Sequence, residues 1–394
     1  MGGSTADVGA HRRALIQGET NVSETDLRYL EGGAAIAGRI RALSGRVPNS
    51  AQVAFASSCL LHGRLFWDSA KDAPLETKPL LLYYGAAAFA KALVLAMKGS
   101  RPQDLSQSHG LSCSAGNADL IANFMIKANG RGVFQEFNDV VAPLNRLQYF
   151  EGSSSRTRAL PTASSDRLSS FAVTLVDCFA RIPGVEEAYQ LSTGANPLQT
   201  HLYLSDAAHE APDLWTIRID VPTLFDGLEA LREVVNDVRV KAPFLNQWRI
   251  REASRAWDNT ILIFTNRAVP ANELEQLQGG PLRFEWNAAQ NSDLFDAFES
   301  IPPLAGGYSR NAAGVAYIEP VGGENVSEYS LMLAALLGLS SLVRYHPHTW
   351  TACVHRRRIS DRAVDDTLLP VIGVFLDTVQ SRFPQFIADA MLGR

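Results

Sequence analysis

Three residues in this sequence have side chains suited to phosphate chemistry: His109, Arg344 and His348. An Arg can hold and neutralise a phosphate group, while a nearby His moves a proton during attack by a hydroxyl group. Three residues separate Arg344 from His348, whereas His109 lies far earlier in the chain. These three are therefore candidate catalytic residues, and a pairing of His109 with Arg344 requires the fold to bring distant segments together.

Four further basic residues are candidates for binding phosphate groups: Lys91, Arg356, Arg357 and Arg358. The arginine run is the strongest basic cluster in a chain whose formal net charge is −5. If this run faced the same side as Arg344 and His109, it would form a phosphate-binding surface.

Each candidate also has a structural interpretation, and the sequence leaves both open. Lys91 lies within an apolar segment, where it could pair with a carboxylate. Arg344 ends an apolar segment and could bond the last free carbonyl groups of a helix, which also suits the helix dipole. His109 could anchor a loop, and the arginine run could be a solvated helix end.

No cofactor and no metal are expected. His346, His348 and His355 are close in the sequence, but no Cys or carboxylate ligand accompanies them in register. The chain also contains no Walker A sequence, GxGxxG loop, GxSxG elbow or HExxH helix. The sequence therefore lacks the minimum parts for these chemistries.

The composition is that of a folded globular protein. The 394 residues are 46% hydrophobic and 20% charged, which excludes disorder as the dominant state. The acidic balance excludes a generally basic surface for nucleic acid. Four cysteines lie far apart without a CxxC pair, so we expect reduced thiols in a cytoplasmic protein.

One segment, Pro79–Met97, is nearly all apolar and long enough to test as a membrane span. Lys91 lies well inside it, and alanines and a glycine reduce its hydrophobicity. An ionisable residue within a lone span is costly, so we expect a buried helix and no membrane. The first 18 residues have no apolar core, so we expect that they do not form a signal peptide.

The hydrophobic pattern predicts helices, short strands and a linker. Helices are expected at Glu24–Ser44, Ser50–Trp67, Pro79–Met97, Asn117–Ala128, Leu168–Ala180, Leu224–Val235, Glu328–Arg344 and Asp361–Arg382. In the last of these, Pro370 either bends the helix or marks its true start, and Pro347 begins a turn that leads into Trp350–His355. Strands, paired antiparallel, are expected at Thr200–Leu204, Leu214–Val221, Thr260–Thr265, Leu282–Trp286 and Gly314–Ile318. Gly130–Phe137 is predicted to be a turn and a strand, and Gly152–Arg167 a linker.

The predicted fold class is α+β, predominantly helical, with one helical domain split around an inserted mixed α/β region. The two most apolar helices lie far apart in the sequence and each needs a partner, so we expect them to pack together. The expected order is an N-terminal extension (1–48), the first half of the helical domain (49–151), a linker (152–167), the inserted region (168–325) and C-terminal helices that complete the helical domain (326–394).

Two blocks of the chain resemble known families. Leu82–Leu93, followed by Ser108–Leu111, resembles the HEPN superfamily, in which a helix with a tyrosine pair precedes a Ser/Thr-His-Gly segment. More narrowly, Lys78–Gly85 and Leu339–Pro347, closed by Trp350, look like the bacterial YaaC-like family. The resemblance implies a HEPN-like helical bundle and covers about a quarter of the chain.

The resemblance also implies candidate functions. HEPN relatives include ribonuclease toxins, antiphage defence components and non-catalytic RNA- or nucleotide-binding proteins. Active HEPN nucleases share an Arg followed a few residues later by a His, whereas seven residues separate Arg101 from His109 here. Tyr83 and Tyr84 are interpreted as packing residues with a buried hydroxyl contact rather than as base-stacking platforms.

Three functions follow as expectations. The first is a binding and assembly module for RNA or a nucleotide, in antiviral defence or a stress response. The alternatives are a metal-independent HEPN endoribonuclease whose Arg/His pair is assembled by the fold, and a structural subunit of a larger complex. We expect a homo-oligomer or a partner protein subunit.

Overall fold

The computed structural model describes most of the chain, and the protein is α+β and mostly helical. The described residues are 24–115, 121–144, 146–151, 154–159, 167–206, 215–265, 273–274, 304–305, 315–355, 358–359, 362–363 and 366–393. The chain forms two units. Unit 1 comprises residues 1–141, 164–196 and 328–394, and unit 2 comprises 142–163 and 197–327.

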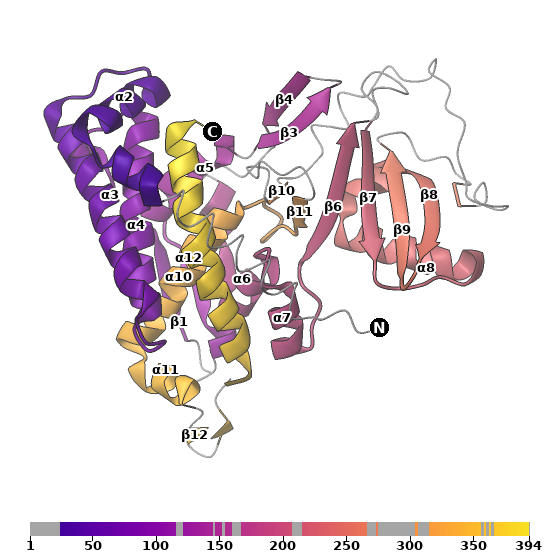
Figure 1. The fold of residues 1–394 in the computed structure, drawn as a ribbon. Helices are drawn as coiled ribbons and strands as arrows, with labels where there is room; N and C mark the ends of the chain where they lie inside the picture. The colour runs from indigo at the N-terminus through magenta and orange to yellow at the C-terminus, as the bar shows by residue number, and fades with distance from the viewer. Residues whose placement is uncertain are drawn as a thin grey trace, which may run out of the picture. The chain divides into compact units, whose positions relative to one another are not determined.

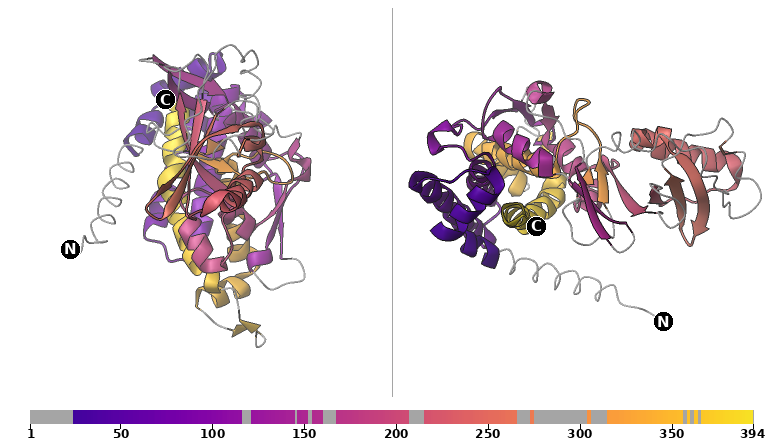
Figure 2. Two further views of the ribbon diagram at one scale, coloured as in Figure 1. Left: turned by 90° about the vertical axis from the view of Figure 1, so that its right-hand side faces the viewer. Right: turned by 90° about the horizontal axis from the view of Figure 1, so that it is seen from above.

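Unit 1 is a bundle of helices from both ends of the chain. Its helices are α2 (Gly33–Ser44), α3 (Ser50–Lys71), α4 (Lys78–Lys98), α5 (Val133–Val141), α6 (Leu175–Arg181), α7 (Glu186–Thr193), α10 (Glu328–Tyr345), α11 (Pro347–Val354) and α12 (Leu369–Leu392). Residues 24–30 are also helical. Figures 1 and 2 show the C-terminal helices, in orange and yellow, beside the indigo and violet N-terminal ones.

The central helix of unit 1 is α4, which contacts α2, α3, α5, α10 and α12. Pro79 stands in its first turn, where the missing N–H costs nothing, and Gly99 ends it in the left-handed conformation. Among the described residues, α4 is the one helix long and apolar enough to cross a membrane, and most of that stretch is buried. The expected packing of α4 against α10 is confirmed.

Two glycines allow α3 and α4 to approach closely. A side chain on Gly63 would reach the ring of Phe89 at 2.5 Å, and one on Gly85 would reach Trp67 at 2.7 Å. Because backbone and rings fill these positions, a larger residue at either glycine would push the helices apart. Close packing here fixes the rotation of α4, and with it the directions of Tyr83 and Tyr84.

A small antiparallel sheet packs against the helices of unit 1. It contains β1 (Leu111–Ser114), β2 (Met125–Ala128) and β5 (Ala172–Thr174), in that order. Both β1 and β2 contact α10. A two-stranded ribbon, β12 (Arg358–Ile359) and β13 (Arg362–Ala363), precedes α12.

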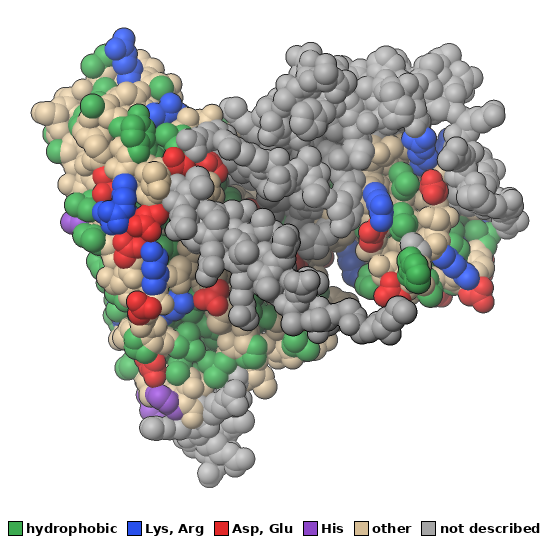
Figure 3. Space-filling view, in the orientation of Figure 1, with side chains coloured by type: hydrophobic (Ala, Val, Ile, Leu, Met, Phe, Trp, Pro, Cys, Tyr) green, Lys and Arg blue, Asp and Glu red, His purple; other side chains and the backbone are tan. Residues whose placement is uncertain are grey.

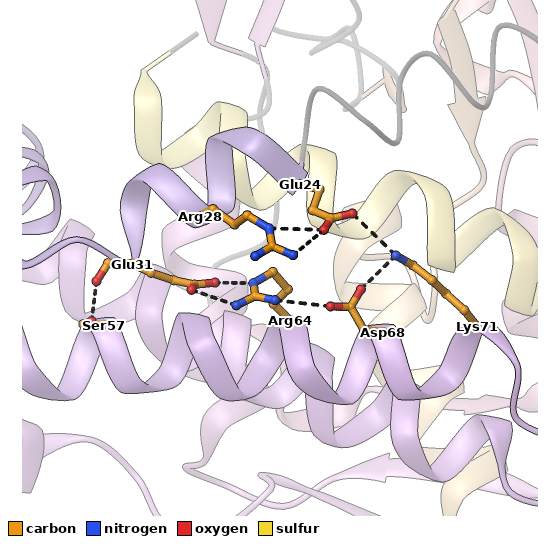
Figure 4. A network of polar contacts seen from close by, with 7 residues as sticks. All are labelled: Glu24, Arg28, Glu31, Ser57, Arg64, Asp68 and Lys71. Atoms are coloured by element: carbon orange, nitrogen blue, oxygen red, sulfur yellow. Dashed lines mark hydrogen bonds and ion pairs between the residues drawn. The ribbon is translucent and has the colours of Figure 1, made fainter.

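A polar network fastens residues 24–30 and the turn after them to α3 (Figure 4). Arg64 donates to both carboxylate oxygens of Glu31, at 2.6 and 3.0 Å, and to Asp68 at 3.3 Å. Lys71 links Asp68 to Glu24 at 2.8 and 3.6 Å. Figure 3 shows basic and acidic side chains interspersed over the helices of unit 1, rather than separated by sign.

We predict that Arg64→Met lowers the free energy of unfolding by about 2 kcal/mol, because it leaves the mostly buried Glu31 carboxylate without its bidentate partner. The matched control is Arg28→Met, whose pair with Glu24 is exposed and is expected to contribute about 0.5 kcal/mol or less. Urea denaturation measures both. Equal effects of the two substitutions would show that Glu31 is solvated in the folded protein.

Unit 2 is built on an antiparallel sheet. The sheet order is β10-β11-β6-β7-β9-β8, from strands β6 (Gln199–Asp206), β7 (Trp215–Val221), β8 (Arg249–Ala256), β9 (Asn259–Thr265), β10 (Leu304–Ala305) and β11 (Val315–Ile318). Helix α8 (Gly227–Lys241) packs on one face, with Leu231, Val235 and Val238 in the core against Ile217 and Phe264 (Figure 1). The expected antiparallel pairing is confirmed.

Several predicted elements are wrong. Asn117–Ala128 is not a helix, because its described part holds a 3-10 turn and β2. Gly130–Phe137 is not a strand, because Val133 begins α5. Leu168–Ala180 contains a 3-10 turn and β5 before α6 begins. Local sequence propensity predicted the wrong element in these short segments, because contacts with neighbouring parts of the fold determine their conformation.

The expected boundaries also differ from the structure. Within the expected linker 152–167, β4 (Ser154–Ala159) pairs with β3 (Arg146–Glu151). Residues 164–196, largely assigned to the inserted region, belong to unit 1. The last long helix begins at Leu369 with Pro370 in its first turn, so of the two expected roles of Pro370 the start of the helix is confirmed and the bend is wrong. The expected strand Leu282–Trp286 lies outside the described residues.

Candidate functional site

The loop that carries His109 is held against the start of α5. The first two backbone N–H groups of α5 donate to the carbonyl oxygens of Ser108, at 3.0 Å, and His109, at 3.1 Å. The side-chain amide of Gln135 donates to the carbonyl of Gly110 at 2.7 Å. Because these bonds use N–H groups that a helix start leaves free, the loop and helix stabilise each other.

Two glycines allow this contact. Gly110 has a φ of 78°, which is a conformation that favours glycine. A side chain on Gly132 would overlap the backbone of Gly110 and lie 2.8 Å from the carbonyl carbon of His109. The short Ser-His-Gly sequence thus has a structural requirement for its glycine.

His109 is hydrogen-bonded to Tyr83 of α4. The Tyr83 hydroxyl lies 2.5 Å from Nδ1 of His109, and the ring centroids are 5.4 Å apart. Tyr83 is buried, and this burial raises the pKa of its hydroxyl, so the phenol stays neutral at physiological pH. When the phenol donates to Nδ1, a neutral His109 carries its hydrogen on Nε2.

Arg344 lies over the ring of the same tyrosine. Its guanidinium carbon is 6.0, 5.8 and 4.9 Å from the ring centroids of Tyr83, Tyr84 and Tyr345. Its Nε donates to the carbonyl of Ser340 at 3.3 Å, and Nη1 donates to the Tyr84 hydroxyl at 3.5 Å. The guanidinium therefore caps the end of α10 and, with Nη2 unused by any described residue, keeps capacity for a ligand.

Lys91 adds a second cation to this region. It is half-buried on α4 and forms no ion pair with any described residue, so the carboxylate partner that its helix suggested is not found there. Burial lowers the pKa of His109, and the charges of Arg344 and Lys91 lower it further. The charges that shift the His109 pKa are thus both positive.

A cysteine connects this region to the middle of α10. The thiol of Cys113, on β1, is hydrogen-bonded to Ser341, and its pKa is raised by burial despite this bond and the charge of Arg344. Burial raises the pKa of Cys59 to about 11. Thiols with raised pKa values are poor nucleophiles, so both cysteines are structural here.

The remaining candidates are His348 and the arginine run. His348 is exposed on α11 and has no hydrogen bond or ring contact with any described residue. Arg356 and Arg357 lie outside the described residues, and of Arg358 only the backbone in β12 is described. The structure therefore describes no side chain of the arginine run.

The neighbouring histidines have partners other than a metal. The ring of His346 lies edge-on to Phe124, 5.5 Å away, and Nε2 of His355 lies 3.0 Å from a carboxylate oxygen of Glu76. Within the part of the chain that the structure describes, no group of three His, Cys, Asp or Glu residues could hold a metal ion.

We name the cluster of Tyr83, Tyr84, Lys91, His109, Arg344 and Tyr345 the basic–aromatic site. It combines two cations, a neutral imidazole and exposed phenol rings, which is the chemistry that binds phosphate and stacks on bases. The sequence indicated His109, Arg344 and Lys91 but missed the role of Tyr83 as the partner of His109. It gave no signal for Tyr345 except its place beside Arg344.

Comparisons with known proteins give one match. Neither the curated proteins nor the solved structures contain a match to this chain. The family of YaaC-like proteins matches residues 44–391, which includes every residue of the basic–aromatic site. The chain therefore belongs to the YaaC-like protein family.

Proposed function

We propose that the protein is a binding and assembly module for a phosphate-bearing ligand, a nucleotide or RNA, held at the basic–aromatic site. The observation that carries the proposal is the position of Arg344 and Lys91 near His109, with neither cation paired to a carboxylate of a described residue. Positive charges that lack an acidic partner in the protein favour an anionic ligand.

Electrostatics within the site support this assignment. Both cations disfavour a proton on His109, so the site carries an uncompensated positive potential. The chain as a whole is acidic, with a net charge of −5, which disfavours non-specific binding of nucleic acid. Binding is therefore expected to be confined to this site.

The direct test is binding of fluorescein-labelled RNA and of inorganic pyrophosphate to the purified protein in EDTA. Arg344→Ala and Lys91→Ala should each weaken binding about tenfold or more, since a hydrogen bond to a charged group contributes about 1.5–3 kcal/mol. Arg41→Ala, which removes an exposed cation from α2, is the matched control and should bind like the wild type. No binding of either probe by the wild type would refute the proposal.

A second candidate function is metal-independent cleavage of RNA. The observation that favours it is that one tyrosine, Tyr83, contacts both His109 and Arg344. A neutral imidazole could move the proton of a ribose hydroxyl while Arg344 neutralises the phosphate. In this reading Tyr83 is a positioning residue that fixes the orientation of the imidazole.

The same labelled RNA distinguishes the two functions. Cleavage in EDTA that is lost in both His109→Ala and Arg344→Ala would support the ribonuclease. Binding without cleavage, with affinity lost only in Arg344→Ala, would assign the site to binding alone. Tyr83→Phe should shift the pH profile of any cleavage, since it removes the hydrogen bond to Nδ1 but keeps the ring.

We predict that a phosphodiester ligand binds about fivefold more tightly at pH 5.5 than at pH 7.5. Burial, Arg344 and Lys91 hold the pKa of His109 below its ordinary value. A bound anion offsets the two positive charges and raises that pKa, so binding takes up a proton and strengthens as the pH falls. A dinucleotide is the suitable probe, because its phosphodiester does not titrate in this range.

Titration calorimetry in two buffers of different ionisation enthalpy measures this proton uptake. His109→Gln should bind with the same affinity at both pH values. A wild-type affinity that is the same at both pH values would mean that the anion does not approach His109.

The wider role is inferred from family resemblance. The Ser108–Leu111 segment and the α4 sequence support a HEPN-like bundle, and HEPN relatives support a place in antiviral defence or a stress response. The free thiols of the described cysteines favour the cytoplasm. A structural role in a larger complex, or a homo-oligomer, is the alternative if neither RNA nor pyrophosphate binds.

A further inference from the structure

We propose that the ligand of the basic–aromatic site is a nucleotide with an unpaired base, which stacks on the exposed ring of Tyr345 while Arg344 holds its phosphate. This inference rests on the proposed function and specifies the class of ligand. A free nucleotide and a single strand share this chemistry, whereas inorganic phosphate and a duplex do not.

The first step concerns Tyr345, which does little for the fold. It is 69% exposed, and its ring lies 4.9 Å from the Arg344 guanidinium. Its neighbour on the helix, Leu342, is buried in the core of unit 1. A tyrosine that is mostly exposed is free to offer a ring face to a ligand.

The second step concerns the other exposed aromatic side chains near Arg344. Tyr84 is 37% exposed and also lies beside Arg344, and Phe66 on α3 is 36% exposed with its ring 5.7 Å from Tyr84. The exposed aromatic side chains therefore come from three helices, α3, α4 and α10. Scattered exposed rings are ordinary, but rings gathered round an arginine without a carboxylate partner form a platform for bases.

The third step relates the platform to the phosphate. Arg344 lies within 6.0 Å of three ring centroids, so a phosphate on its free nitrogen places the attached sugar and base beside those rings. In a duplex the bases are stacked on each other and cannot reach a side-chain ring. A base next to a bound phosphate can stack here only if it is unpaired.

The test compares four probes: pyrophosphate, AMP, a fluorescein-labelled oligoadenylate RNA and the same strand annealed to its complement. The variants are Tyr345→Ala, Tyr345→Phe and the control Tyr29→Ala, which removes a tyrosine that is 61% exposed elsewhere on unit 1. We expect the single strand to bind more tightly than the duplex. Tyr345→Ala should weaken AMP and single-strand binding about tenfold, as for the loss of one stacked base.

Three further results are expected. Tyr345→Ala should leave pyrophosphate affinity unchanged, Tyr345→Phe should retain the affinity for AMP, and Tyr29→Ala should behave like the wild type. If the oligonucleotide binds more tightly than AMP, the ligand is a strand; equal affinities identify a free nucleotide, and both results support the proposal.

Three results would overturn the inference. If pyrophosphate binds but Tyr345→Ala has no effect on AMP or the single strand, the base does not stack here, and the proposed phosphate site stands alone. Tighter binding of the duplex than of the single strand would likewise exclude an unpaired base. If none of the four probes binds, the proposed function fails together with this inference.

Discussion

Replacing Gly132 with Ala is expected to lower the free energy of unfolding by about 3 kcal/mol, through overpacking against backbone that cannot move aside. The added methyl group would overlap the backbone of Gly110 and come within 2.8 Å of the His109 carbonyl carbon. The loop would have to leave the start of α5, which would break its hydrogen bonds to Ser108 and His109. Chemical denaturation measures the loss of stability.

The functional consequence of Gly132→Ala separates it from ordinary destabilisation. Since the loop carries His109 to Tyr83, the folded variant should lose the pH dependence of ligand binding, while Arg344 still binds the phosphate. The control is Gly38→Ala in α2, where nothing lies within 4 Å and the helix should gain about 0.5–1 kcal/mol. A Gly132→Ala protein as stable as the wild type would show that the loop is not packed against α5.

The large helices of unit 1 were predictable because their sequences carry redundant signals. In α4, a first-turn proline, a long apolar run and a terminal glycine all indicate the same element. α10 is apolar over its whole middle, and a helix that is apolar on all sides is expected to be buried against other helices. The pairing of these two helices then brings Arg344 to the side of Tyr83.

Some short elements were not predictable, and α5 shows why. Val133–Val141 contains valines and phenylalanines that favour strands, and two glycines precede it. What makes it a helix is the Ser108–His109 backbone, which accepts its first N–H groups. When the start of a helix depends on hydrogen bonds to residues more than twenty positions away, the sequence of the helix alone predicts its conformation poorly.

The basic–aromatic site was only partly predictable, because the positions of some of its residues also depend on distant parts of the chain. Residue type alone suggested His109, Arg344 and Lys91. The roles of Tyr83 and Tyr84 depend on the rotation of α4, which the close contacts of Gly63 and Gly85 determine. The interpretation of both tyrosines as packing residues describes the buried Tyr83 but not Tyr84, whose ring is 37% exposed.

The start of α10 depends on one ion pair, between Glu328 and Arg382 of α12. Glu328 is 2% exposed on its side chain, and Arg382 donates to it at 2.5 Å and to the carbonyl of Pro183 at 2.9 Å. Arg382→Met keeps the alkyl chain but removes the charge, which leaves the buried carboxylate without this partner. We expect a loss of about 3–5 kcal/mol in the free energy of unfolding.

A double-mutant cycle isolates the ion pair. Adding Glu328→Gln to Arg382→Met should restore about 1–2 kcal/mol, because the double variant no longer buries a carboxylate that has lost its arginine. The Arg382→Met protein should still bind pyrophosphate with wild-type affinity at a temperature where it is folded, since Arg344 lies at the far end of α10. Strictly additive losses would mean that Glu328 and Arg382 do not interact, whereas lost affinity in the folded variant would mean that the start of α10 controls the site at its end.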